Sequence, residues 1–161
     1  PHGLANALLI CNVIRFNAND NPTKQTAFSQ YDRPHARRQY AEIADHLGLT
    51  DSGDRTGAKI EKLLAWLDEI KADLGIPKSI RETGVPEADF LARVDKLSED
   101  AFDDQCTGAN PRYPLISEIK QLLLDSYYGR DFVEHSTAPV NEHIEKKVPQ
   151  KKTAEKKTTK K

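Results

Sequence analysis

The chain has 161 residues, with 24 Lys and Arg against 25 Asp and Glu, 37% hydrophobic residues and a formal net charge of -1. This length is sufficient for one domain with a real core, and the near-neutral charge argues against a dedicated nucleic-acid binder, which needs a basic surface. No apolar run approaches the ~20 residues that cross a bilayer, so neither nucleic acid nor membrane is an expected partner.

The chain has two Cys and no Met, and it begins Pro1-His2-Gly3 directly before an apolar segment. Two cysteines cannot form a disulfide scaffold in a chain of this size, which favours a reducing cytoplasmic location. A start without Met that leads at once into an apolar helix is typical of a piece of a larger protein. We therefore expect a cytoplasmic chain that continues before Pro1.

The first predicted element is a helix over residues 4–16 that is apolar on nearly all sides. Such a helix is normally surrounded by other elements, so we expect it at the centre of the fold. Residues 17–22 contain three Asn and one Asp before Pro22, which predicts a turn that stops the helix. A loop is expected to continue to about residue 33.

Two helices are predicted in the next part of the chain. Pro34 suits the first position of a helix, and Gly48 suits the left-handed residue that ends it. From Asp54 onward, apolar residues recur at helical spacing opposite a charged face, which predicts the longest amphipathic helix, ending at Gly75. The residues of this apolar stripe are Ile60, Leu63, Leu64, Leu67, Ile70 and Leu74.

The remaining elements are also helical. Pro86 is predicted to open a helix, and Ser98, followed by two acidic residues, is predicted to be the N-cap of a short successor. After a loop over residues 106–113, Pro114 is predicted to open a last helix that ends at Gly129. Because no stretch alternates with a period of two, the predicted fold class is all-α.

The last part of the chain differs in composition from the rest. Residues 135–161 contain 8 Lys and 3 Glu, a charge of about +5, which leaves -6 for residues 1–134. With few apolar residues and no period, this tail is predicted to be disordered. It is either a solubilising end or a segment that binds phosphate or acidic surfaces. The sequence therefore predicts a helical domain over 1–134 and a Lys-rich tail over 135–161.

Two polar segments are candidates for chemistry, although no metal-ligand pair, phosphate-binding loop or nucleophile elbow is present. His2 lies at the start of the apolar helix, where an imidazole nitrogen can reach a metal. Residues 103–112 form a loop that holds Cys106 and Arg112. The alternative interpretation of this loop is a capped helix connection in which Cys106 is a small buried group.

Two motifs carry a resemblance to a known family. The segment PHGLANALLICNVIRFN, at residues 1–17, and the segment DDQCTGANPR, at residues 103–112, resemble motifs of the iron-dependent group III alcohol dehydrogenases. The stretch from Gly53 to Val85 and the segment YYGRDFVE before the Lys-rich tail are similar to the branch that joins an acetaldehyde dehydrogenase to an alcohol dehydrogenase. The resemblance covers residues 1 to about 134.

The resemblance implies a fold and site residues. Family members bind Fe²⁺, or Zn²⁺ in some relatives, through one Asp and three His, and the last of these His falls on His2. The other three ligands and the α/β nucleotide-binding domain would precede Pro1, so the chain would be the all-α lid over metal and cofactor. Cys106 would line the nicotinamide and substrate pocket, and we expect Asn110 and Arg112 to fix its loop.

The resemblance also implies an activity. The implied reaction is the NAD-dependent reduction of acetaldehyde to ethanol by metal-assisted hydride transfer. The chain is expected to be inactive on its own, because one imidazole does not hold a catalytic ion. Expected partners are the small aldehyde or alcohol, the enzyme's own N-terminal domains, and further copies in a homo-oligomer that forms helical filaments. The alternatives are a stand-alone group III dehydrogenase for a diol or longer alcohol, and a non-catalytic all-α interaction module with a basic tail.

Overall fold

A computed structural model describes residues 1–19 and 35–134, and within these ranges it is helical and contains no strand. The all-α prediction is therefore confirmed for the described residues. The predicted loop beyond residue 19, Pro34 and the Lys-rich tail over 135–161 lie outside them. The helices are α1 (His2–Asn17), α2 (Ala36–His46), α3 (Thr56–Asp73), α4 (Glu87–Leu91), α5 (Val94–Asp103) and α6 (Ile116–Tyr128), with 3-10 turns η2 (Arg81–Thr83) and η3 (Thr107–Ala109). In the described part of the chain, no helix is long and apolar enough to cross a membrane.

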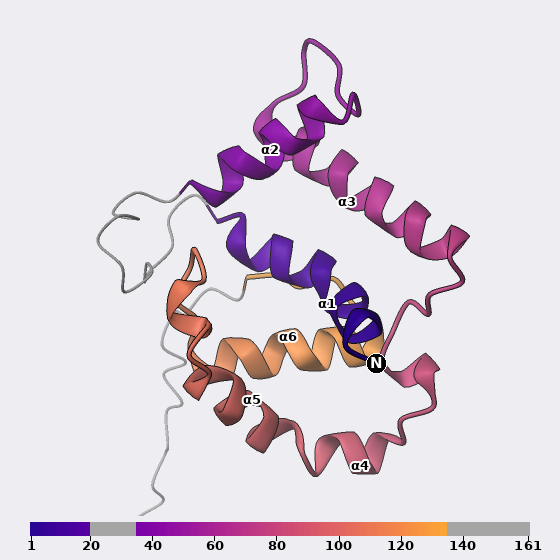
Figure 1. Cartoon of the computed structure of the whole chain (residues 1–161), viewed down its shortest axis with the longest axis vertical. Helices are drawn as coiled ribbons and strands as arrows, with labels where there is room; N and C mark the ends of the chain where they lie inside the picture. The colour runs from indigo at the N-terminus through magenta and orange to yellow at the C-terminus, as the bar shows by residue number, and fades with distance from the viewer. Residues whose placement is uncertain (20–34, 135–161) are drawn as a thin grey trace, which may run out of the picture.

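Helix α1 lies in the middle of the described structure (Figure 1). On one side of it is the pair formed by α2 and α3, and on the other side are α6 and the two shorter helices α4 and α5. One core cluster joins α1 to the pair, and a second joins α4, α5 and α6. The first contains Cys11, Ile14, Ala41, Ile60 and Leu64, and the second contains Phe90, Val94 and Tyr127.

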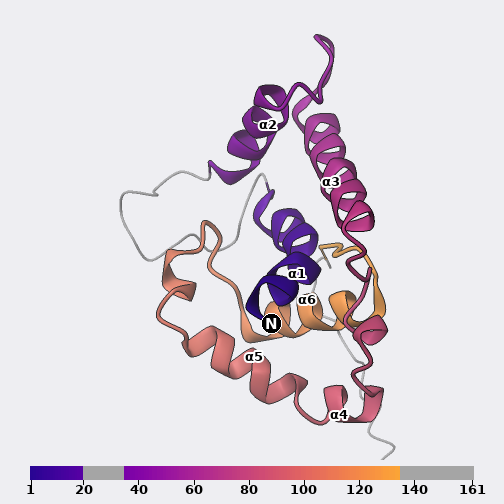
Figure 2. The same cartoon turned by 45° about the vertical axis from the view of Figure 1, so that its right-hand side comes forward.

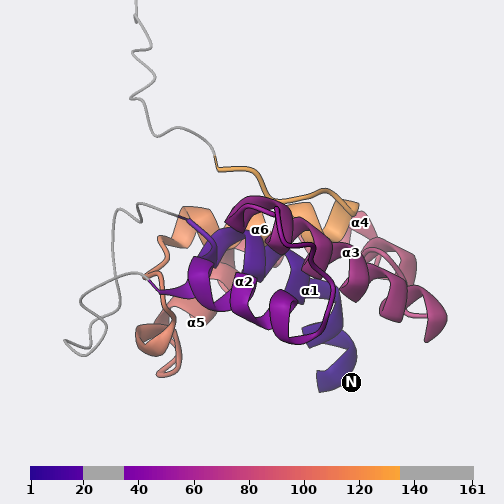
Figure 3. The ribbon, with the colours of Figure 1, turned by 90° about the horizontal axis from the view of Figure 1, so that it is seen from above.

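The central helix is less covered than its composition predicts. Its first turns project beyond the neighbouring helices (Figure 3), and none of residues 2–10 is buried. Ile10 and Val13 are 39% and 36% exposed. The buried residues of α1 lie in its second half, where α3 and α6 contact it. The prediction of a helix surrounded by other elements is therefore wrong for the first half of α1 within the described residues. An exposed apolar helix face of this kind is typical of a surface that another domain or chain covers.

The predicted glycine terminators are confirmed. Gly48, Gly75 and Gly129 follow α2, α3 and α6 with φ angles of 70°, 66° and 67°, a left-handed conformation that a Cβ atom disfavours. At Gly129 a Cβ atom would also lie 3.3 Å from Cβ of Ser79, so two effects favour glycine there.

The prediction for Ser98 is wrong. The break between the two short helices falls at Arg93, and Ser98 lies inside α5, fully buried, where its Oγ donates to the carbonyl oxygen of Val94 at 2.7 Å. The break allows both Phe90 and Val94 to pack with Tyr127, the Phe90 and Tyr127 rings being stacked at 4.1 Å. A serine can occupy the buried side of α5 because the preceding turn satisfies its hydroxyl.

Candidate functional site around the first helix

A buried arginine joins the loop after α5 to the end of α1. The Arg112 side chain is only 2% exposed and donates to the carbonyl oxygen of Phe16 at 3.0 Å. It also donates to Glu118 at 2.7 Å and to Glu134 at 2.8 Å, and its guanidinium lies 4.0 Å from the centre of the Phe16 ring. A buried cation is stable only when it is paired and hydrogen-bonded, and these contacts meet that condition.

An amide pair fixes the same loop a second time. Asn17 Nδ2 donates to Asn110 Oδ1 at 3.1 Å, and Asn110 Nδ2 donates back to Asn17 Oδ1 at 2.8 Å. Asn110 and Arg112 therefore hold the loop against α1, as expected from the sequence. Asn17 itself was expected in the turn after the helix, but it is the last residue of α1 and is buried, because the loop supplies its partner.

The loop between α5 and α6 lies at the edge of the described structure (Figure 2). It contains Cys106, which is exposed. The backbone N–H of Cys106 donates to Asp104 Oδ1 at 2.7 Å, which is the expected capping of a helix connection. The thiol, however, is exposed, so the alternative of a buried Cys106 is wrong. It borders an open, mainly apolar hollow of about 260 Å³ whose wall includes Val13 and Phe16 of α1.

His2 is the first residue of α1 and its imidazole is exposed. Its Nε2 lies 3.1 Å from Asn6 Nδ2, so the amide orients the ring from the next turn of the helix. His2, Asn6 and Val13 share one face of α1, since 3.6 residues complete a turn. Val13 borders the hollow at Cys106. His2 and Val13 thus lie on the same side of α1, but about 16 Å apart along its axis at 1.5 Å per residue.

The described residues provide one imidazole for a metal and no complete site. In residues 1–19 and 35–134, no three His, Cys, Asp or Glu side chains are grouped so that they could hold an ion. A catalytic metal site needs about three protein ligands and one open position. His2 can supply a single ligand, but a metal at Nε2 would have to replace the contact with Asn6 Nδ2, because an amide N–H donates to the same lone pair. The further ligands would have to come from outside the described ranges.

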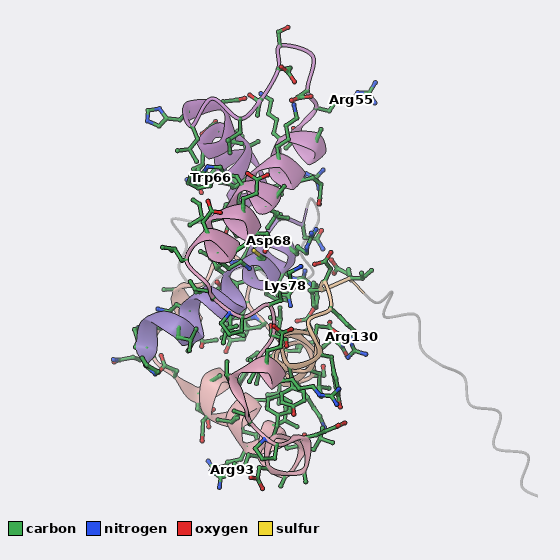
Figure 4. The ribbon with its side chains drawn as sticks, turned by 90° about the vertical axis from the view of Figure 1, so that its right-hand side faces the viewer. Arg55, Trp66, Asp68, Lys78, Arg93 and Arg130 are labelled. Atoms are coloured by element: carbon green, nitrogen blue, oxygen red, sulfur yellow. The ribbon has the colours of Figure 1, made fainter. Side chains whose placement is uncertain are left out.

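The opposite side of α1 contains a more enclosed cavity of about 210 Å³, lined by Cys11 of α1 and Asp68 and Lys71 of α3. Asp68, Lys78 and Arg130 lie around it on one side of the molecule (Figure 4). Lys71 Nζ lies 3.3 Å from Cys11 Sγ, and yet burial raises the pKa of the Cys11 thiol. A protonated, buried thiol is a poor nucleophile, so Cys11 acts as a packing residue.

No sequence pattern predicts the hydrogen-bond partners of Asn12, a polar residue of α1. Asn12 is buried, and its Nδ2 donates to Ser126 Oγ at 3.0 Å and to the carbonyl oxygen of Arg130 at 3.1 Å. Its Oδ1 accepts from the backbone N–H of Phe132 at 2.9 Å. An Asn within an apolar helix is itself a signal, because a buried amide must find partners. The identity of those partners depends on the tertiary structure.

Comparison with known proteins agrees with this architecture. The chain is 80% identical to the bifunctional aldehyde-alcohol dehydrogenase of Escherichia coli (strain K12) over 94% of its own length, which is 17% of that protein. It is 48% identical to an aldehyde-alcohol dehydrogenase of Clostridium acetobutylicum over 79% of its length and 14% of that protein. The crystal structure of a 1,3-propanediol oxidoreductase matches with a TM-score of 0.61 and 29% identity, over 79% of this chain and 28% of that one.

The chain therefore spans less than a fifth of the length of these two relatives and about a quarter of the solved structure. The likeness to the solved structure agrees with the all-helical fold of the described residues. The sequence profile of the Fe-containing alcohol dehydrogenase family, C-terminal part, matches residues 1–127. The chain belongs to the Fe-containing alcohol dehydrogenase family and carries its C-terminal helical region.

Proposed function

We propose that this chain is the helical part of an NAD-dependent alcohol dehydrogenase within a bifunctional aldehyde-alcohol dehydrogenase, and that the enzyme reduces acetaldehyde to ethanol in the cytoplasm. The supporting observation is the 80% identity to the bifunctional Escherichia coli protein over 94% of the chain. The helical domain extends over residues 1–134, and residues 135–161 are a separate Lys-rich tail.

His2 is proposed as one of four ligands of a divalent metal, iron being the metal for which the family is named and zinc the alternative. When bound, such a metal polarises the carbonyl oxygen of an aldehyde toward hydride transfer. The contribution of this chain is to present the imidazole at the exposed start of α1, where a metal at Nε2 would replace the Asn6 amide N–H. The remaining ligands and the nicotinamide-binding domain are proposed to belong to the rest of the enzyme.

Cys106 is proposed to line the cleft for nicotinamide and substrate. Its loop closes one side of an apolar hollow, which can exclude water from a hydride-transfer site. Cys106 is assigned to the cleft wall and not to the metal, because Val13, which borders the same hollow, lies about 16 Å from His2 along α1. The exposed apolar face of α1, which includes Ile10 and Val13, would then be covered by cofactor or by the enzyme's own N-terminal domains.

The alternative activity is that of a stand-alone dehydrogenase for a diol or a longer alcohol. Its support is the 1,3-propanediol oxidoreductase structure, at 29% identity, against 80% for the bifunctional protein. The difference in identity favours acetaldehyde and ethanol. Membership of a dehydrogenase family argues against a non-catalytic interaction module. We also propose that the enzyme assembles into a homo-oligomer that forms helical filaments. No helix face is assigned to the contact between copies.

The proposed function is tested by NADH oxidation in the full-length protein loaded with Fe²⁺. Acetaldehyde should give a higher kcat/KM than butanal or 3-hydroxypropanal, and the separate 161-residue chain should be inactive, because it supplies a single ligand. A preference for 3-hydroxypropanal would support the diol alternative. Activity of the 161-residue chain alone would contradict the proposed division of the metal site.

A further inference from the structure

The chain continues after α6 as an extended segment that runs back beside the helices (Figure 3). We call residues 130–134 the strap. The family profile ends its match at residue 127, whereas the identity with the Escherichia coli protein extends over 151 residues. The strap therefore lies beyond the region matched by the family profile, and its contacts identify what it does in this chain.

The strap is attached to α1 by its backbone and its side chains. Asn12 accepts from the N–H of Phe132 and donates to the carbonyl oxygen of Arg130, so a single amide pairs with two strap residues. The Phe132 ring meets the Phe16 ring edge to face, with centroids 5.7 Å apart. Arg15 reaches Asp131 at 3.3 Å. These contacts fix the path of the strap over the second half of α1.

The end of the strap contacts the buried arginine of the Cys106 loop. Glu134 accepts two hydrogen bonds from Arg112, at 2.8 Å and 3.2 Å, in the forked geometry of a guanidinium and a carboxylate. Glu118, the other carboxylate on Arg112, also accepts from the backbone N–H of Leu115 at 2.7 Å and so serves the start of α6 as well. Glu134 is thus the partner that the strap alone supplies.

We infer that the strap is a positioning element for the Cys106 loop, and that Glu134 is a positioning residue. Glu134 holds the Arg112 guanidinium, which in turn bonds the carbonyl oxygen of Phe16 and so keeps the loop against α1. Loss of Glu134 leaves Arg112 with one carboxylate and lets the loop open more often. The effect of Glu134 on catalysis rests on the proposed function, whereas its effect on the contact between the loop and α1 does not.

The test uses the full-length protein with Glu134→Gln, and Glu69→Gln as the matched control, since Glu69 is an exposed carboxylate of α3 far from the loop in sequence. Because Cys106 is exposed in the closed loop, its reactivity does not measure opening. The backbone N–H groups of Thr107, Ala109 and Asn110 are hydrogen-bonded within the loop, so the rate of their hydrogen–deuterium exchange, followed by mass spectrometry, measures how often the loop opens. Glu134→Gln should raise this rate about fivefold, the change expected for an ion pair worth about 1 kcal/mol. The KM values for NADH and acetaldehyde should rise more than kcat falls.

Two truncations separate the strap from the tail. A chain that stops after Gly129 should show the faster hydrogen exchange in the loop, and a chain that stops after Glu134 should behave as the full-length protein does. The melting temperature of each variant shows whether it is folded. If the chain that stops after Gly129 does not fold, the test rests on the Glu134→Gln variant. Hydrogen exchange of the loop at the control rate in Glu134→Gln would overturn the inference. Faster exchange with unchanged KM and kcat would contradict the effect of the strap on catalysis. A wild-type protein without dehydrogenase activity would contradict the proposed function, and hydrogen exchange would still test the strap.

Discussion

Asn17 and Asn110, separated by 93 positions in the chain, exchange two side-chain hydrogen bonds of 3.1 Å and 2.8 Å. Each amide uses both its donor and its acceptor toward the other, so neither can be replaced by a group with one function. The pair connects the last residue of α1 to the loop that contains Cys106. The loop is consequently part of the same packed unit as the central helix.

In the wild type, Asn110 Nδ2 donates to Asn17 Oδ1 and to the carbonyl oxygen of Arg112. Replacement of Asn110 by Asp removes this donor and places a carboxylate beside both oxygens. We expect Asn110→Asp to lower the free energy of unfolding by about 2 kcal/mol, because acceptors are left unpaired. Asn6→Asp is the control, since Asn6 is exposed in the first turns of α1, where an acidic residue is tolerated. Urea unfolding measures both, and equal small effects would contradict the role of the pair.

The position of Ser98 inside α5 gives a second prediction. At an N-cap, Asp is as good as Ser, but at a fully buried helix position a carboxylate without a partner is costly. Ser98→Asp should therefore destabilise the protein by about 3 kcal/mol. The control Ser117→Asp, at an exposed position in the first turn of α6, should be neutral or slightly stabilising. Thermal unfolding of the two variants measures the difference. A Ser98→Asp variant as stable as the wild type would contradict the buried position of Ser98 and support the N-cap prediction.

Local signals in the sequence were sufficient for most of the helices and for the ends that a glycine marks. Apolar spacing identified the stripe of α3, and Gly75 and Gly129 marked two helix ends, because both effects act within a few residues. The Ser98 prediction failed because the break between α4 and α5 is set by packing of Phe90 and Val94 with Tyr127.

The candidate site was less accessible to sequence reasoning. His2 and Cys106 came from resemblance to a family, since one imidazole and one thiol have no spacing to interpret. The expectation that Arg112 fixes its loop is confirmed, but its partners Phe16 and Glu134 lie 96 and 22 positions away and only the tertiary structure brings them together. The metal ligands expected beyond His2 are not found among the described residues, so that part of the site stays a prediction.

The buried thiol of Cys11 predicts a pH dependence of stability. Burial raises the pKa of this thiol, whereas an unfolded thiol ionises near pH 8.5. The stability that depends on the neutral thiol is therefore fully present below about pH 8.5 and is lost as pH rises toward the pKa of the folded state. Cys11→Ala should flatten the decrease in the free energy of unfolding above about pH 8.5.

The matched control for this prediction is Cys106→Ala, because Cys106 is the exposed thiol of the described residues. Urea unfolding at several pH values should give the wild-type slope for Cys106→Ala and a smaller slope for Cys11→Ala. Equal slopes for the two variants would show that the Cys11 thiol ionises as freely in the folded protein as in the unfolded chain.

The most direct measurement of the central claim is the iron content of the full-length protein with and without the His2 imidazole. We expect about one Fe²⁺ for each wild-type active site and at least a tenfold weaker affinity in His2→Ala, because a catalytic site that loses one of its ligands loses much of its affinity. The control His46→Ala removes an exposed imidazole from α2 and should bind iron as the wild type does. Full iron occupancy in His2→Ala with wild-type affinity would contradict the assignment of His2 as a metal ligand.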